Sequence, residues 1–364
     1  MAIREDLIVL PAEAGIVSEA QARGDDPAVR RITRRKMDAR EARELDATPA
    51  AGFTLDELPR AEREEGRRLA AAASALMLKG LLHRADPRGF PVAAGAQAPD
   101  AVAARLAAEL DPAVFARVQP RLERALREPK RLERILGPFA KVDLRRPELD
   151  PEVAKLVVRP RRGPGGADAG DAVPRGAKFT RAHLILRALH CVRETSGGGA
   201  DEMILGGVLV GASGNVKAIN SIVCGEFDTG DYYDAGELFL GQYSLRTTAG
   251  YPKSLYAIFK LVESDSDDRE VAQQLTATLS LLASTILSAL ASPAVGGTVA
   301  AVMQAIGGFI SDVIDEDEFP PYGIRLTLQS ENQFGGPVGP KERTNDIVGH
   351  GGKYRIGYRW VLNA

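Results

Sequence analysis

The segment Phe179–Val210 reads FTRAHLILRALHCVRETSGGGADEMILGGVLV, two strand-like runs with a glycine-rich break between them. Both runs, Phe179–Arg193 and Met203–Val210, are rich in apolar and β-branched residues, which favour strands. Five further runs, separated by glycine, asparagine and aspartate, lie at 218–223, 237–245, 255–262, 324–329 and 354–362. Seven such runs predict an antiparallel β-sandwich.

The sequence that precedes this segment has a different composition. It is rich in alanine, arginine and glutamate, which suit helices. Leu69, Leu76 and Leu81 lie on one face of a helix predicted between Pro59 and Arg84. A stretch rich in glycine and proline then predicts a flexible linker. The fold class is therefore predicted to be α+β and multidomain, with a helical domain at 1–158, a linker at 159–176 and a β-sandwich at 177–364.

An uncharged segment interrupts the strand-rich half. Residues 271–311 contain no ionisable side chain, and Pro293 with Gly296 and Gly297 divides them into two halves. Small residues recur at every fourth position, which lets two helices approach closely. We predict an inserted apolar helical hairpin at 270–314. Burial against the sandwich is favoured over insertion into a membrane, because acidic residues follow the segment and no basic cluster flanks it.

The net charge of −2 hides an asymmetry, since residues 1–180 carry +5 and residues 181–364 carry −7. Five basic residues lie together at Arg30, Arg31, Arg34, Arg35 and Lys36. Because acids follow this basic run and no aromatic residues are interleaved with it, we interpret it as a salt-bridged helix surface. Nucleic acid is not an expected partner.

Two cysteines, Cys191 and Cys224, are too few for a disulfide framework and are predicted to be buried thiols. Residues 1–11 contain two acids and no long apolar run, so they do not resemble a signal peptide. The expected compartment is the cytoplasm, with export by a non-classical or specialised route as the alternative.

No residue pattern indicates catalysis. His183 and His190 lie seven positions apart on one predicted strand, and a period of two places them on opposite faces. His350 lies between glycines in a predicted turn. The glycines at 206–214 miss the spacing of a phosphate-binding loop. The chain is therefore predicted not to be an enzyme.

Acidic residues gather where the predicted strands end. One group follows the strand at 179–193, a second lies at Asp228–Glu237 and a third follows the strand at 255–262. Loops at one end of an antiparallel sandwich approach each other, and carboxylates brought together repel unless a cation neutralises them. Calcium prefers oxygen ligands of this kind.

The strand at 183–191 with the acids after it, and the strand at 256–262 with Glu263–Asp268 after it, resemble the calcium- and phospholipid-binding β-sandwich family of synaptotagmin and protein kinase C. The resemblance covers roughly residues 180–270, and glutamate stands at three positions where the family has aspartate. It implies Ca²⁺ ligands at Glu194, Asp201, Glu202, Glu263, Asp265, Asp267 and Asp268. Segments 191–202 and 349–354 are also similar to an uncharacterised bacterial domain, which implies no activity.

The expected function is a non-enzymatic, calcium-responsive binding or assembly module. Its expected partner is another protein or a second copy of the chain, and a membrane is the alternative. Two other functions stay open. One is a membrane-inserting pore-forming toxin or effector that uses residues 271–311, and the other is a structural component of a larger bacterial assembly.

Overall fold

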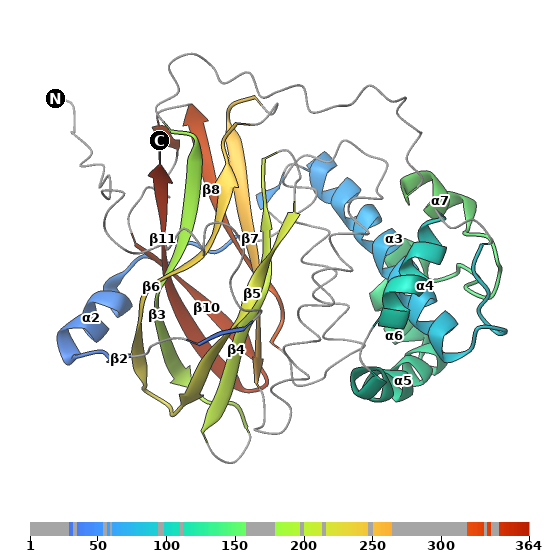
Figure 1. Cartoon of the computed structure of the whole chain (residues 1–364), viewed down its shortest axis with the longest axis horizontal. Coiled ribbons are helices and arrows are strands. Elements are labelled where there is room, and N and C mark those ends of the chain that lie inside the picture. Colours follow the sequence, from blue (N-terminus) through green and yellow to red (C-terminus); the bar gives the residue numbers. More distant parts are fainter. Residues whose placement is uncertain are drawn as a thin grey trace.

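The computed structural model describes residues 29–31, 35–53, 57–58, 60–93, 98–109, 112–157, 179–196, 200–212, 216–246, 250–263, 319–330, 333–335 and 342–363. The predicted linker at 159–176 and the predicted hairpin at 270–314 lie outside these residues. Within them, the chain is an α+β structure of two sheets and several helices (Figure 1).

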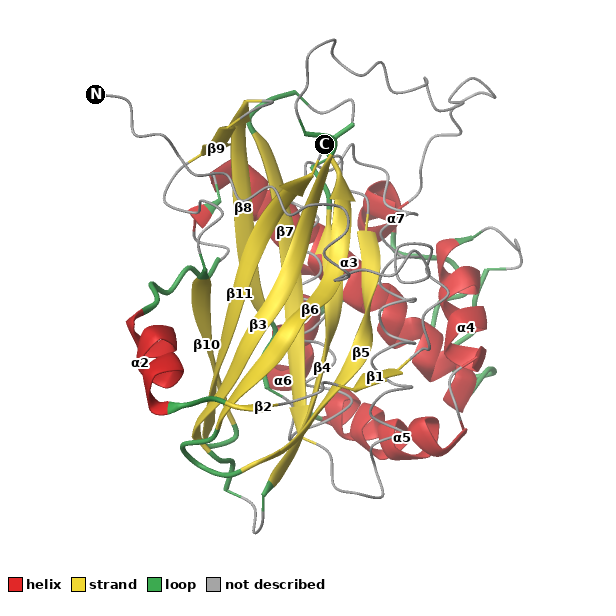
Figure 2. Ribbon diagram, turned by 60° about the vertical axis from the view of Figure 1, so that its left-hand side comes forward, coloured by secondary structure: helices red, strands yellow, loops and turns green. Residues whose placement is uncertain are grey.

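The two sheets are antiparallel apart from one short edge pair. Sheet A has the strand order β1-β5-β4-β7-β8-β9, and sheet B has the order β10-β11-β3-β6-β2 (Figure 2). The strands of sheet A are β1 (Val29–Arg31), β4 (Asp201–Val210), β5 (Val216–Phe227), β7 (Lys253–Glu263), β8 (Tyr322–Ser330) and β9 (Gln333–Gly335). Those of sheet B are β2 (Arg35–Lys36), β3 (Arg181–Arg193), β6 (Tyr232–Ser244), β10 (Arg343–Gly349) and β11 (Gly352–Asn363).

All seven predicted strand runs are confirmed as strands, but the prediction for the basic run near residue 30 was wrong. Residues 29–31 form β1, which pairs in parallel with β5. Residues 35–36 form β2, which pairs with β6. Pairing with strands nearly two hundred residues away overrides the local helical pattern. The salt-bridged character was predicted correctly, because Arg35 contacts Glu41 at 2.6 Å and Lys36 contacts Asp231 at 2.6 Å.

The two sheets share one apolar core. Leu205 and Phe259 of sheet A lie in the same buried cluster as Trp360 and Tyr358 of sheet B. Cys191 and Cys224 are buried thiols, as predicted.

The prediction that His183 and His190 lie on opposite faces was wrong. The inward positions of β3 change from Leu184 and Leu186 to Leu189 and Cys191, because the pairing with β6 is irregular between Leu186 and Ala188. A bulge of this kind inserts one residue and shifts the side-chain alternation. Both histidines therefore lie on the outer face of sheet B, although seven positions apart.

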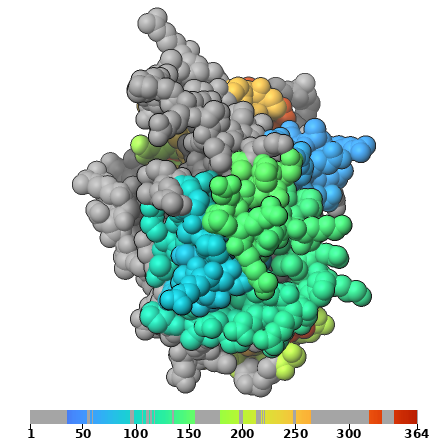
Figure 3. Space-filling view, turned by 90° about the vertical axis from the view of Figure 1, so that its right-hand side faces the viewer, coloured from blue at the N-terminus to red at the C-terminus, as the bar shows by residue number. Residues whose placement is uncertain are grey.

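A layer of helices lies on the side of sheet A that faces away from sheet B (Figures 1 and 3). It contains α3 (Arg60–Ala85), α4 (Pro99–Glu109), α5 (Pro112–Arg127), α6 (Pro129–Leu136) and α7 (Pro151–Val157). Val208 of β4 and Ile258 of β7 belong to the same buried cluster as the apolar face of α3. Phe53 joins this contact, with its ring 5.0 Å from that of Tyr256. The helices and sheet A thus share one continuous core.

A separate helix, α2 (Ala39–Ala47), lies against the outer face of sheet B. Asp38 and Glu41 form a capping box at its beginning. Leu45 is buried above Gly357, where a Cβ atom would lie 2.7 Å from the leucine side chain, so glycine permits this close approach. Asp46 accepts hydrogen bonds from the Tyr232 hydroxyl at 2.7 Å and from Arg355 at 2.8 Å.

Beneath α2, the imidazole of His190 stacks on the Tyr232 ring at 3.5 Å. Burial lowers the pKa of His190 below 6.5 despite the nearby Asp46, and burial with the Arg181 charge lowers the pKa of His183. As the pH falls through 6.5, these histidines take up protons in the unfolded chain before they do so in the folded chain. The free energy of unfolding therefore decreases as the pH falls. We expect urea unfolding between pH 8 and pH 5 to show this loss.

The matched variants are His190→Gln and His183→Gln. Each should flatten the slope of unfolding free energy against pH, and the double variant should flatten it most. An unchanged slope in the double variant would assign the acid sensitivity to other groups.

Candidate functional site

Four predicted calcium ligands lie at one end of the sandwich. Glu194 directly follows β3, Asp201 and Glu202 begin β4, and Glu263 ends β7, where it pairs in register with Met203. The β10–β11 turn of sheet B closes against them, since Ser196 donates its backbone N–H to the His350 carbonyl at 3.3 Å. We call this region the acidic end, and its described residues are 194–196, 201–202, 226–231, 263 and 349–352.

Asp201 is the most buried acid of the acidic end, with 2% of its surface exposed. Its carboxylate accepts hydrogen bonds from the backbone N–H of Thr195 at 2.7 Å, the Thr195 hydroxyl at 2.8 Å and the Tyr354 hydroxyl at 2.5 Å. Burial, together with the hydrogen bond to Asp201, raises the pKa of Tyr354. Asp201 thereby joins β4 of sheet A to β11 of sheet B, and a cation would have to displace these donors.

Glu194 is also held by protein groups. Its backbone N–H donates to the Thr229 hydroxyl at 3.0 Å, and its carboxylate accepts from the backbone N–H of Thr229. This reciprocal pair ties the β3–β4 loop to the β5–β6 turn. Thr229 is exposed, so the pair can open to solvent without disturbing the core.

Asp231 stabilises the same turn. Burial alone would raise its pKa, but the Lys36 ammonium at 2.6 Å and hydrogen bonds from the Asp228 N–H and the Tyr233 hydroxyl lower it. Because the native pKa lies below that of the unfolded chain, this carboxylate stabilises the fold above pH 4 and loses its contribution in stronger acid. The role of the Asp231 carboxylate is therefore structural.

Glu202, which is partly buried, pairs in register with the exposed Glu226 of β5, so the two residues are cross-strand neighbours. The predicted ligands Asp265, Asp267 and Asp268 lie outside the described residues. Among the residues that the structure describes, no group of three or more histidine, cysteine, aspartate or glutamate side chains could hold a metal ion. The seven predicted ligands thus fall into four that share one end and three that the structure does not describe.

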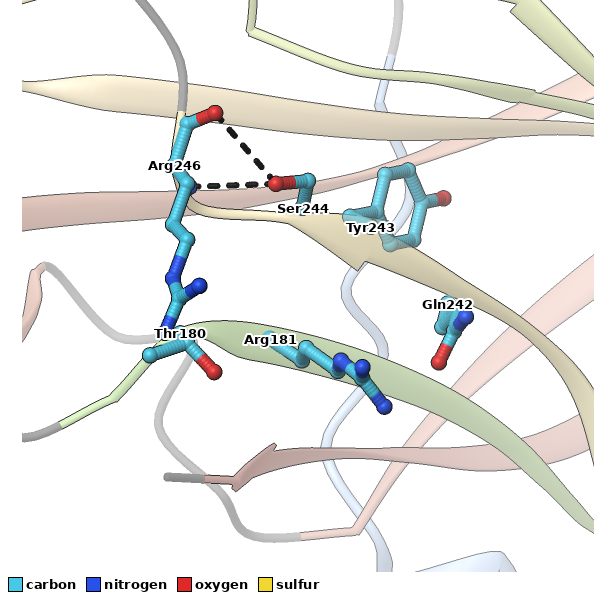
Figure 4. Close-up of a pocket in the computed structure, with 6 residues that line it drawn as sticks. All are labelled: Thr180, Arg181, Gln242, Tyr243, Ser244 and Arg246. Atoms are coloured by element: carbon cyan, nitrogen blue, oxygen red, sulfur yellow. Dashed lines mark hydrogen bonds between the residues drawn. The ribbon is translucent and has the colours of Figure 1, made fainter. Parts of the chain in front are cut away.

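A pocket at the other end of the sandwich had no counterpart in the sequence patterns. It has a volume of about 540 Å³ and is lined by Thr180, Arg181, Gln242, Tyr243, Ser244 and Arg246 (Figure 4). Its polar residues come from the beginning of β3 and the end of β6, which are more than sixty residues apart. The only signal in the sequence is that Arg181, which begins β3, and Arg246, which follows β6, have no acidic residue next to them in the chain.

Comparisons with protein-family models, curated proteins and solved structures give no match to this chain. The resemblance to calcium-binding β-sandwich domains therefore stays a prediction. No helix in the described part of the chain has the length and apolar character needed to cross a lipid bilayer.

Proposed function

We propose that this protein is a non-enzymatic binding module whose acidic end responds to calcium and docks on the surface of a partner protein. The observation that carries the proposal is the placement of Glu194, Glu202 and Glu263 at the same end of two packed sheets. The chain leaves β7 at Glu263 beside the first residues of β4, and the acidic residues 265–268 follow directly.

The proposed ligands divide by role. Glu263 and the acids at 265–268 provide carboxylate oxygens on one continuous stretch, which suits the six to eight ligands that calcium takes. Glu194 can turn to a cation by releasing Thr229. Asp201 supports the loop through Thr195 and Tyr354 rather than through the metal. Calcium bound here would neutralise the carboxylates that follow β7 in the sequence.

The described histidines of the sandwich support a non-enzymatic role, because each has a packing function. His183 contacts Asn363 at 3.2 Å and the ring of Phe239 at 5.2 Å. His190 is stacked beneath α2, and His350 lies at positive φ in the β10–β11 turn with its ring near Phe319.

Calcium should raise the melting temperature of the full chain, and a chelator should reverse the shift. Ligand binding at a hundredfold excess over Kd adds about 2.7 kcal/mol to the free energy of unfolding. The triple variant D265N/D267N/D268N should lose this response. The matched control is E128Q/E133Q/E148Q, which removes three exposed acids from the helical layer and should keep it.

Isothermal titration with Ca²⁺ provides the second measurement. A wild-type chain with neither heat of binding nor a melting shift would end the calcium proposal. If the chain sediments with vesicles of phosphatidylserine and phosphatidylcholine only when calcium is present, the partner is a membrane surface and not a protein.

A further inference from the structure

The pocket at the end of the sandwich opposite the acidic end is lined by two arginines and several neutral polar residues. Thr180 and Arg181 lie at the beginning of β3, and Gln242 and Ser244 lie near the end of β6, followed by Arg246. The thirteen residues of β3 separate this pocket from the acidic end by roughly 40 Å. The two regions are therefore independent sites.

The two arginines of the pocket have no acidic partner among the residues that the structure describes. Elsewhere on sheet B, Arg187 and Arg359 both contact Glu237, at 2.6 and 2.5 Å. No corresponding carboxylate lies within ion-pair distance of Arg181 or Arg246 in the described chain. Both side chains are exposed at the pocket (Figure 4). Two unneutralised guanidinium groups at one cavity attract an anion.

A third cationic side chain, Lys253, contacts the chain next to the pocket. Lys253 is only 5% exposed, and its ammonium donates to the carbonyl of Leu245 at 2.6 Å. Leu245 stands between Ser244 and Arg246 in the chain, so this ammonium lies close to residues that line the pocket. A buried charge is screened less by salt than an exposed one.

Neutral donors complete the lining. Thr180, Ser244 and Gln242 line the pocket together with the two arginines (Figure 4). The Ser244 hydroxyl also accepts from the backbone N–H of Arg246 at 3.2 Å, which fixes the start of the loop. Tyr243 also borders the pocket, but its ring is buried in the sandwich core, where its hydroxyl donates to the Tyr256 carbonyl at 2.7 Å.

We propose that this pocket binds a phosphate monoester. Such a group carries up to two negative charges and three acceptor oxygens, which match two arginine forks and several neutral donors. The volume lies within the range of small-molecule sites, so the organic part of the ligand fits as well. The ligand is either a soluble phosphorylated metabolite or the headgroup of a phosphomonoester lipid.

The soluble probe is glycerol 3-phosphate, titrated calorimetrically into the full chain. Wild type should bind it, and R181Q and R246Q should each weaken binding by about tenfold or more, because each removes a charge-assisted contact. The double variant should not bind. The matched control is R193Q, an exposed arginine at the other end of the same strand, which should bind like wild type.

The lipid source is tested by flotation with phosphatidylcholine vesicles that do or do not contain phosphatidic acid. Binding to the soluble probe alone assigns a metabolite, and binding to phosphatidic acid vesicles that R181Q abolishes assigns a lipid headgroup. Affinity should rise as the phosphate loses its second proton near pH 6.

Three results would overturn the proposal. The first is that a wild-type chain that unfolds cooperatively binds neither probe. The second is that R193Q and R181Q lose the same amount of affinity for glycerol 3-phosphate. The third is that wild type binds acetate as tightly as it binds glycerol 3-phosphate. The arginine variants carry exposed substitutions, so their melting temperatures should equal that of R193Q. None of these results depends on added calcium.

Discussion

Replacement of Asp201 with alanine should lower the free energy of unfolding by about 3–5 kcal/mol. The change removes one buried carboxylate and leaves three donors without an acceptor, namely the N–H and hydroxyl of Thr195 and the hydroxyl of Tyr354. Each unsatisfied buried donor costs about 1–3 kcal/mol. These hydrogen bonds join the two sheets and the β3–β4 loop, so few local adjustments can compensate for their loss.

Trp360 is the only tryptophan of the chain and is fully buried in the sandwich core, so its fluorescence reports this unfolding during a urea titration. Tyr354→Phe is the companion variant, because it removes one hydroxyl and keeps the ring packed on Phe227 at 5.7 Å. Its cost should be about 1–2 kcal/mol.

The combined variant D201A/Y354F separates a structural role from a ligand role. If the two groups act through their hydrogen bond, the costs of the single variants should not add. A D201A chain that matches wild type in stability without calcium, yet no longer responds to calcium, would make Asp201 a metal ligand instead.

The sequence patterns predicted the strands whose apolar residues alternate or form continuous runs. They did not predict β10, because Arg343–Gly349 has only Ile347 in the main core and reads as a polar loop. They also misassigned residues 29–31 and 35–36, because edge strands of two or three residues take their structure from a distant partner. Local sequence patterns predict a strand where its buried residues recur periodically. They fail where only pairing with a distant strand determines the structure.

The same limit applies to the candidate sites. That acids follow strand ends was visible in the sequence, and the antiparallel sheets place Glu194, Glu202 and Glu263 at one end. The hydrogen-bond partner of Asp201 was not visible in the sequence, since Tyr354 lies 153 positions away in the chain. The arginine pocket likewise depends on the register that brings the start of β3 to the end of β6.

Lys79→Ala in α3 should be as destabilising as the change at Asp201, with an expected loss of about 3–5 kcal/mol. The Lys79 side chain is almost fully buried, and its ammonium lies 3.2 Å from the Asp100 carboxylate. It also donates to the carbonyl of Arg146 at 2.8 Å. Truncation leaves a buried negative charge and an unfilled cavity within the helical layer. Urea unfolding measured by circular dichroism should show the loss.

Lys79→Met and the pair K79M/D100N show which part of that loss is electrostatic. Methionine fills most of the space, so K79M keeps the packing but leaves Asp100 unpaired. In wild type, the Asp100 carboxylate accepts a hydrogen bond from the N–H of Ala93 at 2.9 Å. Asparagine at position 100 removes the charge and keeps an oxygen that can accept this hydrogen bond. The double variant should therefore be more stable than K79M. Equal stability of the two would show that the unpaired charge is not the main cost.

The same variants test whether the helical layer and the sandwich unfold together. Val208 and Ile258 of sheet A share a core with α3, so a loss at Lys79 should reach the sheets. In K79A, the circular dichroism transition of the helices and the fluorescence transition of Trp360 should then shift to the same lower urea concentration. A fluorescence midpoint that stays at the wild-type value would mean that the sandwich holds its structure without the helices, and that the shared core contributes little to its stability.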